Sequence, residues 1–256
     1  MDLKELPLRA FERHPWEIAR ADFFLGLLRK HLAETALRAL DIGSGDGYFA
    51  RRLLADLPAV ATVTCFDPAY DAGWLEAHAQ RQQGLAFTAE RPGGTFDLVL
   101  LLDVLEHTAD DRALLHEAAT SFAKPDSWLL VSAPAHQALF SHHDRLLGHR
   151  RRYSPVRLRA LATEVGLDVV AHGQLFASLL LPRALAKLGE VVRGGSAKAV
   201  PVSGRIETPL GTWHHGDMIT SAVKTVLALD ATGSQFAARW RLALPGLSAW
   251  VLARRR

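Results

Sequence analysis

Cysteine is almost absent from this chain: one residue, Cys65, occurs among 256. A single cysteine excludes an internal disulfide framework and a metal site built from several thiolates. Long apolar runs are also missing. The most apolar stretch, 175–188, is interrupted by one proline and two basic residues and is too short for a bilayer span. Residues 1–5 lack the basic-then-apolar order of a secretion signal. We therefore expect a cytoplasmic protein without a transmembrane helix.

A basic stripe with interleaved aromatic residues is missing as well. The formal charge of +3 and the pI near 9.2 come largely from arginine clusters at 150–152 and 254–256. This pattern disfavours nucleic acid as a partner. Hydrophobic residues make up 49% and charged residues 22% of the chain, which are ordinary globular values. The length suffices for one full α/β core, so we expect a single domain over 1–256.

Three alternating glycines organise the sequence. An apolar run at 37–42 stops at Gly43, Gly45 and Gly47, and helical spacing of apolar residues begins at Tyr48. This order predicts a strand, a tight turn and a helix start. Glycine permits positive φ and close approach of a ligand to the backbone, and the free N–H groups of the helix start point at that ligand. A dinucleotide fingerprint needs glycine where Tyr48 stands, so an NAD-dependent oxidoreductase is the disfavoured alternative.

An acid precedes the glycines. With Asp41 the pattern becomes D-x-G-x-G-x-G, which resembles motif I of the class I S-adenosylmethionine-dependent methyltransferases. The resemblance implies that this acid meets the amino-acid end of the cofactor. A second acid, Asp67, ends the strand expected at 61–66 and is followed by Pro68. Its carboxylate is placed to accept hydrogen bonds from the ribose hydroxyls. The alternative is that Asp67 only begins a turn.

The resemblance implies an α/β, Rossmann-like fold: a seven-stranded, mostly parallel sheet of order 3-2-1-4-5-7-6 with helices on both faces. Segment 14–20 resembles the His-Trp-Trp-x-x-x-Arg motif of the type 11/12 subgroup, which implies an N-terminal helix at about 10–33 that covers the cofactor. The alternative is that segment 14–20 holds a packed aromatic residue and a surface arginine without a role in binding.

Segment 103–107, D-V-L-E-H, resembles the family's motif after the fourth strand. The cofactor-binding residues so implied are Trp16, Arg20, Asp41, Gly43, Ser44, Gly45, Gly47, Tyr48, Asp67, Pro68, Asp103 and Val104.

Residues 134–153, expected as a loop after the fifth strand, contain four histidines and four arginines. They resemble the subgroup's D-x-x-x-G-H-x-R-R-Y sequence. Histidine titrates near neutrality and suits the removal of a proton from a hydroxyl acceptor. We therefore expect His143 and His149 as catalytic bases, with Asp144 orienting one of them. The substrate-binding candidates are His107, His136, Arg151, Arg152 and Tyr153, although arginine and tyrosine also anchor loops.

A metal at His142, His143, Asp144 and His149 fits by ligand type, but the resemblance does not require one, and we expect none.

Further helices are predicted at 75–83, 110–122, 155–165 and 217–229, further strands at 128–133, 167–176 and 244–252, and a loop at 194–216. A helical insertion at about 178–243 is expected as a lid, with an amphipathic helix at 178–192. That helix suits a lipid-like acceptor or peripheral contact with a membrane.

The sequence thus predicts a methyltransferase that uses S-adenosyl-L-methionine. Its acceptor is expected to be small or amphipathic. Arginines beside a cationic cofactor favour an anionic group on it, and the histidines favour transfer to oxygen. The alternative is a non-catalytic regulatory or scaffold protein that binds the same cofactor. The pattern gives no indication of oligomeric state.

Overall fold

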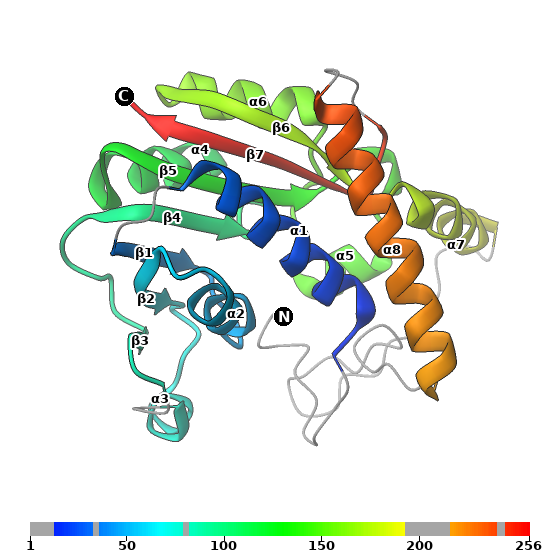
Figure 1. Cartoon of the computed structure of the whole chain (residues 1–256). Coiled ribbons are helices and arrows are strands. Elements are labelled where there is room, and N and C mark those ends of the chain that lie inside the picture. Colours follow the sequence, from blue (N-terminus) through cyan, green and yellow to red (C-terminus); the bar gives the residue numbers. More distant parts are fainter. Residues whose placement is uncertain (1–12, 33–35, 79–81, 193–215, 240–243) are drawn as a thin grey trace.

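The computed structural model describes residues 13–32, 36–78, 82–192, 216–239 and 244–256 (Figure 1). Its strands form one seven-stranded sheet of order β3-β2-β1-β4-β5-β7-β6. The first five strands in this order pair in parallel, and β7 pairs antiparallel with both β5 and β6. The predicted topology is confirmed. The strands are β1 (Leu37–Ile42), β2 (Val60–Phe66), β3 (Leu85–Thr88), β4 (Phe96–Leu102), β5 (Ala123–Pro134), β6 (Leu167–Leu175) and β7 (Ser248–Arg255).

Helices cover both faces of the sheet, because the side chains of the central strand β4 are apolar on both faces. Leu98 and Leu100 belong to the core beneath α1, and Val99 and Leu101 belong to the core on the opposite face. The described helices are α1 (Pro15–His31), α2 (Tyr48–Asp56), α3 (Ala72–His78), α4 (Asp111–Glu117), α5 (His142–Leu147), α6 (Pro155–Glu164), α7 (Leu180–Val192) and α8 (Gly216–Arg239). None of them is both long and apolar enough to cross a membrane.

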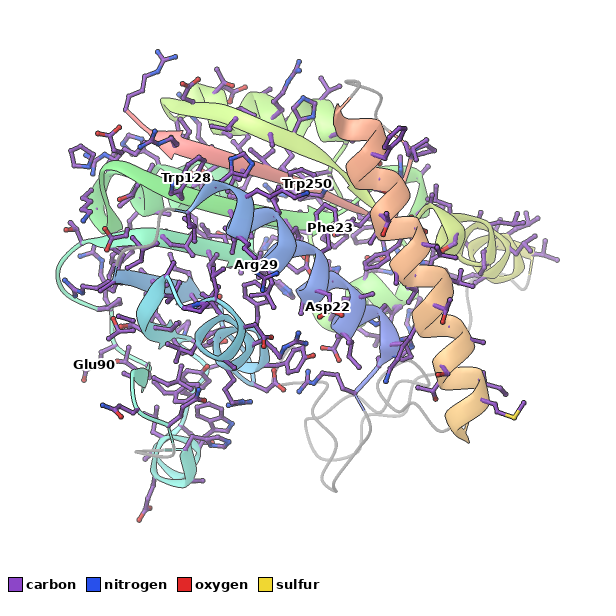
Figure 2. The ribbon with its side chains drawn as sticks, in the orientation of Figure 1. Asp22, Phe23, Arg29, Glu90, Trp128 and Trp250 are labelled. Atoms are coloured by element: carbon purple, nitrogen blue, oxygen red, sulfur yellow. The ribbon has the colours of Figure 1, made fainter. Side chains whose placement is uncertain are left out.

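Helix α1 lies diagonally across the sheet beside α2 and α8 (Figure 1). Figure 2 shows Phe23 and Trp250 between α1 and β7, and their ring centroids are 5.3 Å apart. Asp22 pairs with Arg52 of α2 at 2.7 Å, and Arg29 donates to the carbonyl of Asp56 at 2.9 Å. The N-terminal helix is therefore fixed to β7 by aromatic packing and to α2 by two polar bonds.

Several predicted boundaries were wrong. Strand β5 begins at Ala123 instead of 128, helix α3 begins at Ala72 instead of 75, and α8 extends to Arg239 instead of 229. The end of the helix predicted at 110–122 is a π-helix at 118–122. Strand β7 begins at Ser248 instead of 244, since Pro245 has no N–H and Gly246 donates to the side chain of Gln174. The loop predicted at 194–216 lies almost wholly outside the described residues.

The segment predicted as a loop at 134–153 contains helix α5, and this is the correction that matters most for function. Ser141 and Asp144 form a reciprocal capping box at the start of α5, and Gly148 ends the helix with φ +82°. The two caps satisfy the free backbone groups that make so short a helix unstable alone. Asp144 and His149 therefore stand at opposite ends of an ordered turn.

Candidate active site

The turn between β1 and α2 is closely packed. Gly43, Gly45 and Gly47 have φ values of +67°, +53° and +68°, a region that side chains other than glycine rarely adopt. A Cβ atom on Gly43 would lie 2.7 Å from Val104, and one on Gly47 would lie 2.6 Å from Phe87. The turn is thus held against the loop after β4 and against β3. We call this turn the glycine cradle; its backbone has no room for a Cβ at position 43 or 47.

Two carboxylates flank the cradle from neighbouring strands. Asp41, at the end of β1, is buried, and burial raises its pKa to about 7, with Arg20 opposing the shift. Asp67 follows β2, and its Oδ2 accepts from the amide of Gly45 at 3.1 Å while Oδ1 accepts from the amide of Ala69 at 3.0 Å. Pro68 is exposed. The predicted acids are therefore together at the carboxyl edge of the parallel strands, where ligands of such sheets bind.

An aromatic stack beside Asp67 was missed by the sequence analysis. Tyr70 and Trp74 are parallel with centroids 3.9 Å apart, Trp74 and His78 are parallel at 3.8 Å, and Phe87 meets them edge-on. The Tyr70 hydroxyl donates to the carbonyl of Gly45 at 2.6 Å, and burial raises its pKa. The four-residue spacing of Tyr70, Trp74 and His78 was the available signal. The three stacked rings form an aromatic column next to the cradle, in which Tyr70 and His78 cover the two faces of Trp74.

Helix α1 reaches the site through Arg20. Its guanidinium lies over the Trp16 ring, 4.8 Å from the centroid, and forms an ion pair with Asp103. Asp103 has φ +59° and accepts from the Ser132 hydroxyl at 3.1 Å. Arg20, which the resemblance assigns to cofactor binding, therefore has Asp103 as its partner. Arg20 thereby joins α1 to the end of β4.

The glycine cradle is completed by two neighbouring side chains. The Ser44 hydroxyl is 2.8 Å from that of Tyr70. The Tyr48 ring packs under the guanidinium of Arg13, 3.9 Å from the ring centroid, and its hydroxyl accepts from Arg52 at 3.1 Å. Both predicted residues therefore lie at the turn.

Asp144 is the centre of the second half of the site. Its side chain is fully buried and accepts from the amide and hydroxyl of Ser141 at 2.8 and 2.9 Å, from Arg152 at 2.8 Å and from Arg183 of α7 at 3.1 Å. Nδ1 of His149 lies 3.1 Å from its Oδ1. Although burial opposes ionisation, the bonds from His149 and Arg152 hold the pKa of Asp144 well below its usual range.

His149 and His143 differ in their surroundings. The Asp144 carboxylate fixes one ring nitrogen of His149, so that its Nε2 is the nitrogen left for other partners. The His149 ring meets His107 edge to face, with centroids 4.7 Å apart. For His143, burial and the nearby charge of Arg183 lower the pKa to about 4. The structure thus brings His107, His149 and Asp144 together and makes His143 a weakly basic, neutral imidazole at pH 7.

The remaining predicted residues tie the segment to the loop after β4. Arg151 donates to the carbonyls of Thr108 and Ala109 at 3.0 and 2.8 Å and pairs with Asp111 at 2.9 Å. The buried Tyr153 donates to the same Asp111 at 2.8 Å. The Arg152 side chain is 8% exposed, and that of Arg151 is 31% exposed. Arg151 is therefore the one of the pair that solvent reaches more easily.

His136 stands at the end of β5 with φ +63°. Its Nε2 is buried and has no hydrogen-bond partner among the described residues. A non-glycine residue in this region of φ is uncommon and is often found at functional sites. His136 thus remains a candidate for contact with a ligand.

A family model described as a methyltransferase domain matches residues 11–172. The chain belongs to this methyltransferase family. The resemblance of the glycine turn to class I enzymes is thereby confirmed, and the protein is an enzyme that uses S-adenosyl-L-methionine. The glycine cradle and its two flanking acids fit that cofactor. No curated protein matches the chain in sequence.

Solved structures share the fold at low sequence identity. A putative sarcosine dimethylglycine methyltransferase from Galdieria sulphuraria is 16% identical, with a TM-score of 0.55 over 96% of this methyltransferase and 91% of that chain. Phosphoethanolamine N-methyltransferase 2 of Haemonchus contortus, in complex with S-adenosyl-L-methionine, is 16% identical, with a TM-score of 0.53 over 91% of this chain and 52% of that one. The [4+2]-cyclase SpnF is 14% identical, with a TM-score of 0.54 over 97% and 84%. The shared fold therefore accompanies different reactions.

Proposed function

We propose that this methyltransferase transfers a methyl group to an oxygen of a small or amphipathic, anionic acceptor. The observation that carries the proposal is the Asp144–His149 pair. A buried carboxylate on Nδ1 fixes the orientation of the imidazole and leaves Nε2 to take a proton from a hydroxyl. His143, with its lowered pKa, is the weaker candidate for the base.

The cofactor half of the site supplies binding and orientation. We assign the glycine turn and Asp41 to the amino-acid end of the cofactor, Asp67 to the ribose, and the aromatic stack that begins at Tyr70 to the surroundings of the base. When bound, S-adenosyl-L-methionine supplies an electrophilic methyl group on a cationic sulfur. The protein's contribution to such a displacement is mainly alignment and exclusion of water. Trp16 and Arg20 on α1 are positioned for both tasks.

The preference for an anionic acceptor rests on the balance of charge around α5. Arg152 and Arg183 both bind the single carboxylate of Asp144, and Arg151 lies on the same segment. Guanidinium groups bind carboxylates and phosphates in bidentate geometry. We therefore assign Arg151, together with His107 and His136, to the acceptor's charged group, and Arg152 and Tyr153 to holding that surface in place.

The amphipathic character of the acceptor rests on α7. Its polar side reaches α5 through Arg183, and Glu190 accepts from the amide of His142 at 2.9 Å. Its apolar side chains Leu181, Leu185 and Leu188 are 58–67% exposed. An apolar helix face next to the acceptor side of the site suits an acyl or isoprenoid tail or the surface of a membrane.

Replacement of Asp67 by alanine is expected to weaken S-adenosylmethionine binding by roughly ten-fold or more. A hydrogen bond to a charged group contributes roughly 1.5–3 kcal/mol, and the same carboxylate also fixes the amide of Gly45. Calorimetric titration gives the dissociation constant. Glu76→Ala, which removes an exposed acid on α3, is the matched control and should bind as the unaltered protein does. Equal affinity of Asp67→Ala and the control would exclude the ribose assignment.

The acceptor is tested with a panel of small molecules. We expect S-adenosylhomocysteine to form fastest with alcohols or phenols that carry a carboxylate or phosphate, more slowly with their uncharged esters, and not with ammonium compounds. Arg151→Ala should raise the Michaelis constant for the anionic acceptor about ten-fold, the equivalent of one charge-assisted hydrogen bond. Mass spectrometry of the product identifies the methylated atom. Methylation of amines alone would contradict the proposal.

A further inference from the structure

Glu106 has an environment that the proposed methyl transfer does not explain. Its side chain is fully buried at the carboxyl end of β4, and neither carboxylate oxygen has a hydrogen-bond partner on another described residue. Its position is well fixed, because its carbonyl accepts from the amide of Arg150 at 2.7 Å. Buried polar groups are nearly always bonded, so an unpartnered acid in an ordered segment indicates a missing partner.

Two imidazoles lie next to this acid. His107 follows Glu106 in the chain, and its carbonyl accepts from Nε of Arg150 at 3.2 Å. His149 comes from the other side, where the capped helix α5 ends. One ligand atom each from Glu106, His107 and His149 lie within 4.8 Å of one another. Among the residues that the structure describes, this is a convergence of three potential ligands from two separate segments.

The contact between His149 and Asp144 resembles the contact that a metal-binding histidine makes through its second nitrogen. Nδ1 of His149 is held by the buried carboxylate of Asp144, and metal-binding histidines regularly donate their second nitrogen to such a group. Two imidazoles and one carboxylate are a donor set for Zn²⁺ and related divalent ions, with further positions left open. A tetrahedral ion with bonds of about 2.0–2.2 Å needs ligand atoms roughly 3.4 Å apart. The three ligand atoms would therefore move closer together when an ion binds.

We propose that Glu106, His107 and His149 form a binding site for a divalent transition-metal ion of the Zn²⁺ class, with Asp144 as the outer partner of His149. The site was not grouped in the sequence analysis, which considered His142, His143, Asp144 and His149 and expected no metal. Those residues share α5 and its ends, whereas the proposed ligands come together only because Arg150 and Arg151 bind the segment 106–109.

The consequence for catalysis rests on the proposed function. A bound ion with an open position lowers the pKa of a coordinated hydroxyl and holds the resulting oxygen in place. In an ion-loaded enzyme the acceptor's oxygen would bind there, Nε2 of His149 would be a ligand, and the hydroxyl proton would pass to water. In an ion-free enzyme the same nitrogen would take the proton. Metal binding itself needs neither the cofactor nor an acceptor, so its test is independent of the methyl-transfer proposal.

The test is titration of the chelator-treated protein with Co²⁺, which reports its ligands by visible absorbance, and with Zn²⁺ by calorimetry. We expect one equivalent to bind with the absorbance of a site containing nitrogen ligands. Glu106→Gln and His149→Ala should each weaken binding at least ten-fold, because each removes a direct ligand. His172→Ala on β6 and His116→Ala on α4 are the controls, because each removes a histidine outside the proposed site. Both should bind Co²⁺ and Zn²⁺ as tightly as the unaltered protein does.

Glu106→Gln keeps the shape and burial of the side chain, so thermal melting should show it folded. Asp144→Asn is expected to weaken binding by roughly ten- to a hundred-fold through the outer contact alone. The proposal is overturned if the unaltered protein binds no equivalent of Co²⁺ or Zn²⁺. It is equally overturned if folded Glu106→Gln and His149→Ala bind as tightly as the His172→Ala control.

Discussion

Gly45→Val is expected to weaken S-adenosylmethionine binding by about a hundred-fold or more while the sheet remains folded. Gly45 has φ +53°, and a β-branched residue held in such a region costs about 1–3 kcal/mol. The chain relieves that strain by moving the turn, which displaces the amide on Asp67 and the carbonyl on Tyr70. The cradle and both of its flanking groups are lost in one change.

Calorimetric titration with S-adenosylmethionine and thermal melting, measured on the same samples, separate loss of binding from loss of fold. Gly93→Ala is the matched control, since its Cβ would meet nothing within 4 Å and its φ is not positive. The control should bind and melt as the unaltered protein does. If Gly45→Val keeps its affinity within a few-fold, the turn does not hold the cofactor.

The cofactor side of the site was predictable because its causes are local, whereas the strand order followed from the family resemblance. The glycine spacing, the apolar run of β4 and the acids at Asp41 and Asp67 are each contained in one strand and the turn that follows it. The rule that carboxyl ends of parallel strands share one edge then brings them together. No knowledge of distant contacts is needed for this half of the site.

The acceptor side was less predictable because its groups meet through contacts across the chain. The sequence does contain the signal for α5: Ser141 and Asp144 at capping-box spacing, followed by Gly148. The burial of Glu106 has no such local signal. It depends on Arg150 and Arg151 crossing from the far end of the segment to the carbonyls of 106–109. Arg150 and Arg151 therefore build this part of the site.

Asp144→Ala is expected to destabilise the protein by about 3–5 kcal/mol, the range for removal of one partner from a buried ionic group. The change leaves the guanidiniums of Arg152 and Arg183, 8% and 17% exposed, without their shared carboxylate. It also removes the N3 side of the capping box of α5. Equilibrium urea unfolding measures the change.

Glu164→Ala is the comparison for Asp144→Ala, since Glu164 pairs with Arg157 at 2.9 Å with both side chains more than 40% exposed. Exposed pairs contribute about 0–1 kcal/mol, so this variant should unfold nearly as the unaltered protein does. Asp144→Ala combined with Arg152→Ala should cost less than the sum of the single changes, because the double variant leaves fewer unpaired charges. A loss below 1 kcal/mol for Asp144→Ala would mean that solvent reaches these arginines. Asp144 could then neither fix His149 for proton transfer nor support it as a metal ligand.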